Sequence, residues 1–172
     1  MNILCFGDSN TWGYKPDKTG RFDENTRWTA LLQKKLGPEY HIIEEGLCGR
    51  TTVFQDELRE SRRGLDMIGV TVEMHNPLDL VIIMLGTNDC KTRYGASASV
   101  IARGLDQVIR KHGSMHLSTL ICLSSLRSIL VMVSEKRILT RNSMRDLRSF
   151  PEISQMNTVS CTPKSCCFFE CR

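Results

Sequence analysis

No apolar run in the 172-residue sequence approaches the roughly 20 residues that a membrane-spanning helix needs. The start of the chain also lacks the basic segment of a secretory leader, and its apolar stretch, Ile3–Phe6, is too short for a leader's hydrophobic core. These absences argue against a membrane partner and favour the cytoplasm, where the eight cysteines are expected to be reduced. The sequence therefore predicts a cytoplasmic protein.

The net charge of the sequence is also small. The formal net charge is only +4, which is too small to indicate a nucleic-acid partner. The hydrophobic fraction of 41% and the charged fraction of 24% are ordinary for a globular protein, and the length fits one domain with a real core. The composition leaves a homo-oligomer open.

The last third of the chain lacks glycine, tyrosine and tryptophan almost entirely. Residues 1–112 hold eleven of the twelve glycines, every tyrosine and tryptophan, and 15 acidic against 15 basic side chains. Residues 113–172 hold 4 acidic and 8 basic side chains, five of the eight cysteines and eleven serines. We therefore predict an α/β core over residues 1–112 and an atypical tail over residues 113–172.

Strand and helix patterns alternate along the first 113 residues. Short apolar runs predict strands, and apolar residues at helical spacing predict the helices between them. The expected strands of the core are 2–6, 40–44 and 79–85, and the expected helices are 27–37, part of 56–73 and 97–113. This alternation predicts right-handed crossovers and a parallel sheet with helices on both faces. Beyond the core, further strands are expected at 117–123 and 128–134.

Each of the three core strands runs into a polar, glycine-containing loop. The loops read GDSN at 7–10, GLCGR at 46–50 and GTND at 86–89. Because ligands of open α/β sheets bind at the carboxyl ends of the strands, these loops are expected to gather at one functional edge.

The three loops contain the parts of an acyl-transfer site. Ser9 is a candidate nucleophile, and the backbone N–H of Gly49 and the side-chain amide of Asn88 are candidate donors to an oxyanion. Taken singly, each residue also has an ordinary structural interpretation: a helix cap for Ser9, a turn for Gly49, and an Asx turn or a cap for Asn88.

Neighbouring residues offer candidate substrate contacts. Arg50 could bind a carboxylate or phosphate of the substrate, but a surface ion pair is the favoured interpretation. Trp12 could wall an acyl pocket or pack in the core. Asp8 is expected to anchor its loop by accepting backbone N–H bonds.

The ordered set of GDSN, GLCGRTT and GTND resembles the SGNH, or GDSL-type, serine hydrolases over about residues 1–112. The additional stretches TWG at 11–13 and LDLVIIMLGTND at 78–89 are similar to the bacterial arylesterase and acyltransferase branch. The resemblance implies a flavodoxin-like three-layer α/β/α sandwich that hydrolyses small carboxylic esters without a cofactor or metal. It assigns the nucleophile to Ser9 and the oxyanion donors to Gly49 and Asn88, with Asn10 in place of the usual leucine.

The fourth block of that family, Asp-x-x-His near the C-terminus, is absent from the sequence. In the family this histidine is the base and the aspartate orients it. None of the four histidines has an aspartate three residues before it, and the last of them is His116. A shifted reading frame from about residue 113 and a genuinely divergent terminus are both open. Under either interpretation, we predict that the chain turns over esters weakly or not at all.

Three further expectations complete the sequence-based account. The cysteines at 161, 166, 167 and 171 lack the paired Cys-x2-Cys spacing of zinc ribbons, so no metal site is predicted. Residues after about 140 are expected to pack loosely, because their apolar residues have no consistent period. The rival functions are a non-catalytic remnant and a flavodoxin-like module whose Asp8–Thr11 loop holds a phosphate or flavin.

Overall fold

The computed structural model describes residues 1–113, 120–124 and 130–133. Its centre is a five-stranded sheet in the order β2-β1-β3-β4-β5. The strands are β1 Asn2–Gly7, β2 His41–Gly46, β3 Leu80–Leu85, β4 Leu120–Ser124 and β5 Leu130–Val133. The helices are α1 Ser9–Trp12, α2 Trp28–Leu36, α3 Gly64–His75 and α4 Ala98–Gly113, with short 3-10 turns at Asn88–Cys90 and Thr92–Tyr94.

The first four strands of the sheet are parallel to one another. β1 pairs with β2 on one side and with β3 on the other, and β3 pairs with β4. The chain therefore winds outward from β1 in two directions, and the carboxyl ends of β1 and β3 flank the point where the winding reverses. Such a switch point is the usual ligand site of an open α/β sheet.

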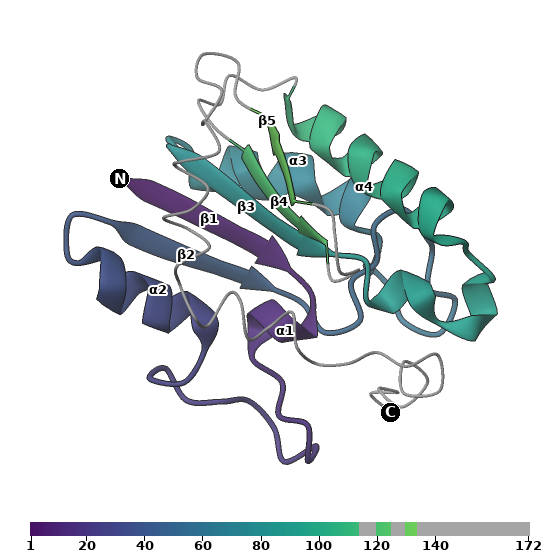
Figure 1. Cartoon of the computed structure of the whole chain (residues 1–172), viewed down its shortest axis with the longest axis horizontal. Coiled ribbons are helices and arrows are strands. Elements are labelled where there is room, and N and C mark those ends of the chain that lie inside the picture. The colour runs from purple at the N-terminus through teal and green to yellow at the C-terminus, as the bar shows by residue number, and fades with distance from the viewer. Residues whose placement is uncertain (114–119, 125–129, 134–172) are drawn as a thin grey trace.

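Helices pack on both faces of the sheet, as the sequence predicts (Figure 1). Alternate residues of the strands supply the two faces, since successive side chains of a strand point in opposite directions. On one face Leu4 and Phe6 pack with residues of α3 and α4. On the other face Ile3 and Cys5 pack with Trp28 and Leu32 of α2. This is the predicted three-layer sandwich.

Two differences from the sequence-based expectation concern strands at the edges of the sheet. Strand β2 runs to Gly46, two residues beyond the expected end, because its pairing with β1 continues as far as Gly7. Strand β5 pairs antiparallel with β4, so this edge, which lies beyond the predicted parallel core, runs in the opposite direction. The expectation for residues after about 140, and the tail cysteines, lie outside the described residues.

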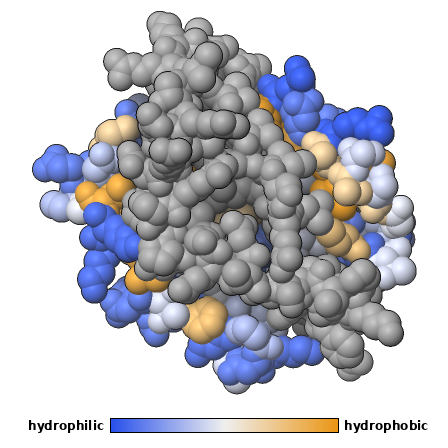
Figure 2. All heavy atoms as spheres, in the orientation of Figure 1, coloured by the Kyte–Doolittle hydropathy of each residue, from blue (hydrophilic) through white to orange (hydrophobic). Residues whose placement is uncertain are grey.

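The described part of the surface is mostly hydrophilic where the space-filling view exposes it (Figure 2). Large apolar side chains that remain exposed include Leu58, Val70 and Met74. Within the described ranges, no helix combines the length and the apolar character needed to cross a bilayer.

Candidate active site

The loop after β1 carries Ser9 at the start of α1. Asp8 is fully buried and its Oδ1 accepts the Asn10 backbone N–H at 2.9 Å, which makes Asp8 the N-cap of α1. The predicted anchoring role of Asp8 is thereby confirmed. Ser9 itself is half-buried. The cap fixes the backbone that carries the candidate nucleophile.

Gly49 occupies the third position of a tight turn after β2. The Arg50 N–H donates to the Leu47 carbonyl at 3.0 Å, and Gly49 has a φ of +88°. A positive φ at this position defines a type II turn, which strongly favours glycine. A Cβ at this position would approach Arg59 Nη1 to 2.8 Å, but this flexible side-chain end can move, so the backbone conformation is what favours glycine.

Asn88 follows β3 and has 7% of its surface exposed. Its Nδ2 donates to the Arg50 carbonyl at 3.0 Å. A side-chain amide carries two N–H donors, so this bond fixes the orientation of the side chain and leaves the second N–H for another acceptor. The contact joins the loop of Asn88 to the turn that holds Gly49.

The loop of Ser9 is tied to both of the others. Asn10 Nδ2 lies 3.4 Å from Thr87 Oγ1, the neighbour of Asn88, across the switch point of the sheet. The Leu47 N–H donates to the Gly7 carbonyl at 3.1 Å. The structure thus joins the three predicted loops to one another at the carboxyl edge of the sheet.

Close backbone packing reinforces this edge. A Cβ at Gly46 would lie 2.2 Å from the Trp12 backbone nitrogen, so α1 rests directly on the end of β2. Any larger residue at Gly46 would push the nucleophile loop away from the β2 loop.

A second link between two of the loops was not anticipated from the sequence. Asp89 is fully buried and accepts hydrogen bonds from the backbone N–H of Thr52, at 2.9 Å, and from its hydroxyl. Burial raises the pKa of the Asp89 carboxyl, against the lowering effect of the Thr52 bonds. The sequence contains one indication of this contact, because GRTT and GTND place polar residues beside the oxyanion candidates.

The expectation of a surface ion pair for Arg50 is wrong, because the side chain is buried. Its side chain is 3% exposed and its Nη1 donates to the Gly7 carbonyl at 2.9 Å and to the Glu45 carbonyl. Its guanidinium carbon lies 3.9 Å from the centre of the Phe6 ring. These contacts direct the charge into the protein, where it meets backbone carbonyls and an aromatic face.

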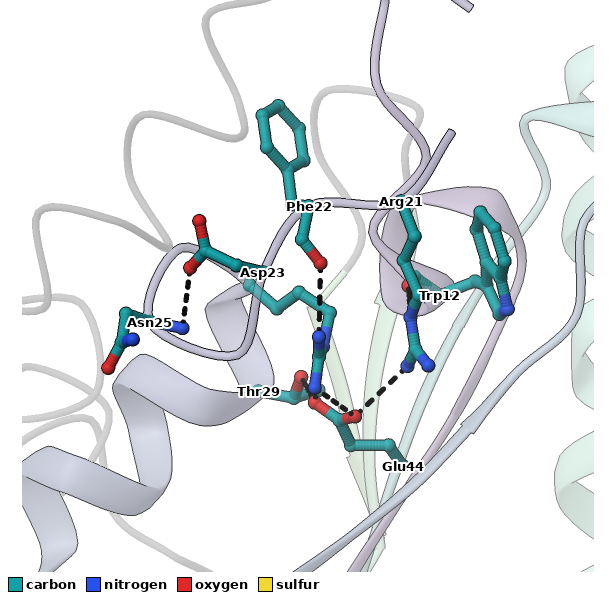
Figure 3. Close-up of polar contacts among 8 residues, drawn as sticks. Trp12, Arg21, Phe22, Asp23, Asn25, Thr29 and Glu44 are labelled. Carbon is teal, nitrogen blue, oxygen red and sulfur yellow. Dashed lines mark hydrogen bonds and ion pairs between the residues drawn. The ribbon is translucent and has the colours of Figure 1, made fainter. Parts of the chain in front are cut away.

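Trp12 is half-buried beside the nucleophile loop and is braced from one side (Figure 3). Arg21 Nε donates to the Trp12 carbonyl at 2.6 Å, and the guanidinium carbon lies 5.2 Å from the centre of the Trp12 ring. The same arginine contacts Glu44 Oε2 at 3.1 Å. The loop before α2 is therefore fastened to both Trp12 and β2.

Glu44 is the centre of that bracing network (Figure 3). Besides Arg21, it pairs with Arg27 at 3.0 Å and accepts the Thr29 hydroxyl. Burial would raise the pKa of the Glu44 carboxyl, but the hydrogen bonds from Arg27 and Thr29 and the two positive charges leave that pKa lowered. Sequence reasoning missed this network, because its members are separated by up to 23 residues.

Neither histidine whose side chain is described supplies the absent base motif. His41 is exposed at the first position of β2, the end opposite to the Ser9 loop. His75 ends α3, and its Nε2 lies 2.8 Å from Glu45 Oε1. Among the described residues, no group of three or more histidine, cysteine, aspartate or glutamate side chains is placed to hold a metal ion.

We expect Asp8→Asn to stabilise the protein at neutral pH. Burial raises the pKa of Asp8 from 3.8 to about 6, so the unfolded carboxyl ionises first as pH rises between these values. The folded state therefore loses stability over that window, by up to about 3 kcal/mol at roughly 1.4 kcal/mol per unit. Thermal unfolding should place the variant's midpoint roughly 6 °C above wild type at about pH 7.5.

The advantage of Asp8→Asn should shrink as pH falls and vanish at about pH 3, where the wild-type carboxyl is mostly protonated in both the folded and the unfolded protein. Asp17→Asn is the control, because Asp17 is exposed and should give no such pH-dependent gain. A variant less stable than wild type at neutral pH would show that ionised Asp8 is needed for the fold.

Comparison with known proteins places this geometry in a family. The sequence model of the GDSL-like lipase/acylhydrolase family matches residues 5–153, and the chain belongs to that family. The match extends well beyond residue 112, the limit that the sequence motifs set for the resemblance. No match was found among curated protein sequences.

Solved structures similar to this chain include bacterial esterases. The native aryl esterase of M. smegmatis is 42% identical with a TM-score of 0.62, and a carbohydrate acetylesterase from Sinorhizobium meliloti is 40% identical with a TM-score of 0.61. Each comparison covers 64% of this chain and 53% of the other. The chain therefore spans about half the length of these two relatives. An inhibitor-bound form of the aryl esterase aligns over 91% of this chain at 29% identity.

Proposed function

We propose that Ser9 is the nucleophile of an ester hydrolase that acts on small carboxylic esters. The observation that carries this proposal is the linkage of the three loops, through Asn10 with Thr87 and through Asn88 with Arg50. Family membership supports the same assignment. Gly49 and Asn88 then serve as the oxyanion donors that the sequence predicts.

The proposed reaction has two steps. Ser9 Oγ bonds to the ester carbonyl carbon, and the carbonyl oxygen becomes an oxyanion that accepts from the Gly49 N–H and the free Asn88 Nδ2–H. Collapse of this intermediate breaks the bond to the alcohol oxygen, which leaves with the proton that Ser9 has lost. Water then attacks the acyl-Ser9 ester and releases the carboxylic acid. No cofactor takes part.

Trp12 is proposed to form one wall of the substrate site. It lies three residues after Ser9 on α1, and Arg21 covers part of its ring and holds its backbone. The names of the two structural relatives, an aryl esterase and a carbohydrate acetylesterase, both describe ester cleavage. A small acyl group with an aryl or sugar alcohol is the substrate class we propose.

Arg50 is proposed to have a structural role in place of the substrate-binding role considered from the sequence. Its 3% exposure and its bonds to two backbone carbonyls support this reassignment. A substrate anion would need an exposed donor, and none of these contacts offers one.

The absent Asp-x-x-His block is proposed to limit this chain to slow chemistry. Residues 1–112 supply the nucleophile and the oxyanion donors, and no aspartate precedes any histidine of the sequence at the required spacing. Both formation and hydrolysis of the acyl-serine need a base. With an ester whose alcohol is a good leaving group, such as 4-nitrophenol, acylation is the less demanding of the two steps, so the acyl group is expected to accumulate on Ser9.

The test is incubation of the chain with excess 4-nitrophenyl acetate. We expect a slow release of up to one equivalent of nitrophenolate per chain, with one acetyl group retained on the protein by intact mass. Ser9→Ala should show no such burst, and Ser61→Ala, a change at an exposed serine, should behave as wild type. A burst of equal size in Ser9→Ala, or none in wild type, would contradict the proposal.

A further inference from the structure

We propose that Arg50 is a positioning residue, which holds the ends of β1 and β2 and the amide of Asn88 in a single catalytic geometry. This inference rests on the proposed function, because it explains how the parts of that site are kept in place. It concerns a side chain that touches no substrate and acts through its neighbours.

The side chain of Arg50 connects two loops. One nitrogen, Nη1, donates to the carbonyl of Gly7, which directly precedes Asp8 and Ser9. The same nitrogen donates to the carbonyl of Glu45, one residue before the end of β2. A shared donor fixes the distance between the strand ends that carry the nucleophile loop and the Gly49 loop.

The main chain of Arg50 connects the third loop. Its carbonyl accepts from Asn88 Nδ2 at 3.0 Å, and its N–H closes the turn that contains Gly49. One residue thus contacts every loop of the site: Gly7 through its side chain, Leu47 through its N–H and Asn88 through its carbonyl. Rotation of the Arg50 backbone would move the Gly49 N–H and the Asn88 amide together.

Burial of the Arg50 charge costs free energy, and packing alone does not explain why an arginine is found there. Burial lowers the pKa of Arg50 to about 10, although the charges of Glu45 and Asp8 act in the opposite direction. Its buried Nε has no hydrogen-bond partner among the described residues. An apolar side chain would avoid the desolvation of a cation, so the contacts to the strand ends offer the better reason for arginine.

A planar guanidinium suits this role better than an ammonium. It lies against the face of the Phe6 ring, at 3.9 Å from its centre, while its edge donates to the carbonyls. Lysine carries the charge but has neither the flat face nor the rigid fork of donors. Arg50→Lys should therefore restore part of the function and not all of it.

The test compares Arg50→Met with Arg50→Lys in the full chain, using two independent measurements. One is the rate of the 4-nitrophenyl acetate burst. The other is the pair of Asn88 side-chain amide signals in a ¹H–¹⁵N NMR spectrum, assigned by their loss in Asn88→Ala. Because misplacement by about 1 Å can cost about 100-fold, we expect Arg50→Met to slow the burst by about that factor, and Arg50→Lys by about 10-fold.

Two control variants separate positioning from loss of stability. Val72→Ala removes a fully buried side chain of α3 and destabilises the fold through the core. Arg110→Met removes an exposed arginine of α4, which forms an ion pair with Asp106 on the same helix. Both should leave the Asn88 signals in place, and the burst rate should change little at a temperature where each variant is folded.

The outcomes are distinct. A slower burst and shifted, faster-exchanging Asn88 signals in Arg50→Met, absent from Val72→Ala, would support the inference. Unchanged Asn88 signals and an unchanged burst rate in Arg50→Met would overturn the inference. If Arg50→Met does not fold, the same two measurements on Arg50→Lys decide. Shifted Asn88 signals in a chain whose wild type shows no Ser9 burst would uphold the positioning role and reject the proposed function.

Discussion

A chimera that carries residues 1–113 of this chain and a family C-terminal segment with the Asp-x-x-His block is expected to hydrolyse 4-nitrophenyl acetate on the order of 10²–10⁴ times faster than the 172-residue chain. A positioned general base typically contributes about 10²–10⁴-fold, and a serine triad without one member keeps only the contributions of binding and the oxyanion site. Steady-state kcat/KM, measured after the burst is complete, gives the comparison.

The same chimera provides its own control. Replacing the grafted histidine with alanine should return the rate to that of the 172-residue chain, and Ser9→Ala in the chimera should be as harmful as the histidine change, because triad members act as a unit. A fast 172-residue chain that depends on Ser9 would reveal a base elsewhere, with His116 the first candidate. A chimera that is folded and slow would contradict the assignment of the first 113 residues as a competent half of the site.

Asn88→Ala is expected to slow acylation of Ser9 by about 10²–10³-fold, the usual cost of one oxyanion donor, or about 3–4 kcal/mol of transition-state stabilisation. The reason is the second Nδ2–H, whose direction is set by the bond of the first to the Arg50 carbonyl. The burst rate in the 172-residue chain and kcat in the chimera should fall together, with a smaller change in KM.

Asn88→Asp tests whether the donor itself matters. It preserves the size of the side chain and replaces the N–H donors with a carboxylate, which would repel the oxyanion, so it should be at least as slow as Asn88→Ala. Asn25→Ala, a change at an exposed position of the loop before α2, should leave the rate unchanged. Equal rates for wild type and Asn88→Asp would exclude Asn88 from the oxyanion site.

Much of the fold follows from local sequence patterns. Ile3–Phe6 and Val81–Leu85 are continuous apolar runs, which suit strands covered on both faces by helices, and the structure buries all of them. Gly37 ends α2 with a φ of +85°, where the sequence predicts the stop. The amphipathic spacing of Ile101, Leu105 and Val108 likewise predicts α4, and these residues lie in the core.

The candidate site could be predicted in part for the same reason. Parallel strands bring their carboxyl ends to one edge, so motifs at strand ends meet there whatever their separation in sequence. The place of Ser9, Gly49 and Asn88 in neighbouring loops is therefore a consequence of topology. Their chemical roles remain predictions that the proposed experiments test.

Long-range polar contacts could not be predicted in this way. An arginine is typical of a surface or a ligand-binding site. Only the nearby carbonyls of Gly7 and Glu45 explain why Arg50 is buried. Asp89 and Thr52 are separated by 37 positions and share no periodic pattern. The antiparallel direction of β5 also depends on tertiary pairing, because a short apolar run does not specify the direction of its neighbour.

The most direct test of the central claim, that Ser9 is a nucleophile in a preformed oxyanion site, is covalent labelling of the 172-residue chain with a fluorophosphonate, followed by peptide mapping. The account predicts one phosphonyl group per chain, located on Ser9, whose rate of formation falls in Asn88→Ala and whose adduct is absent from Ser9→Ala. Labelling spread over other serines at comparable rates, or an unlabelled Ser9 in folded protein, would contradict it.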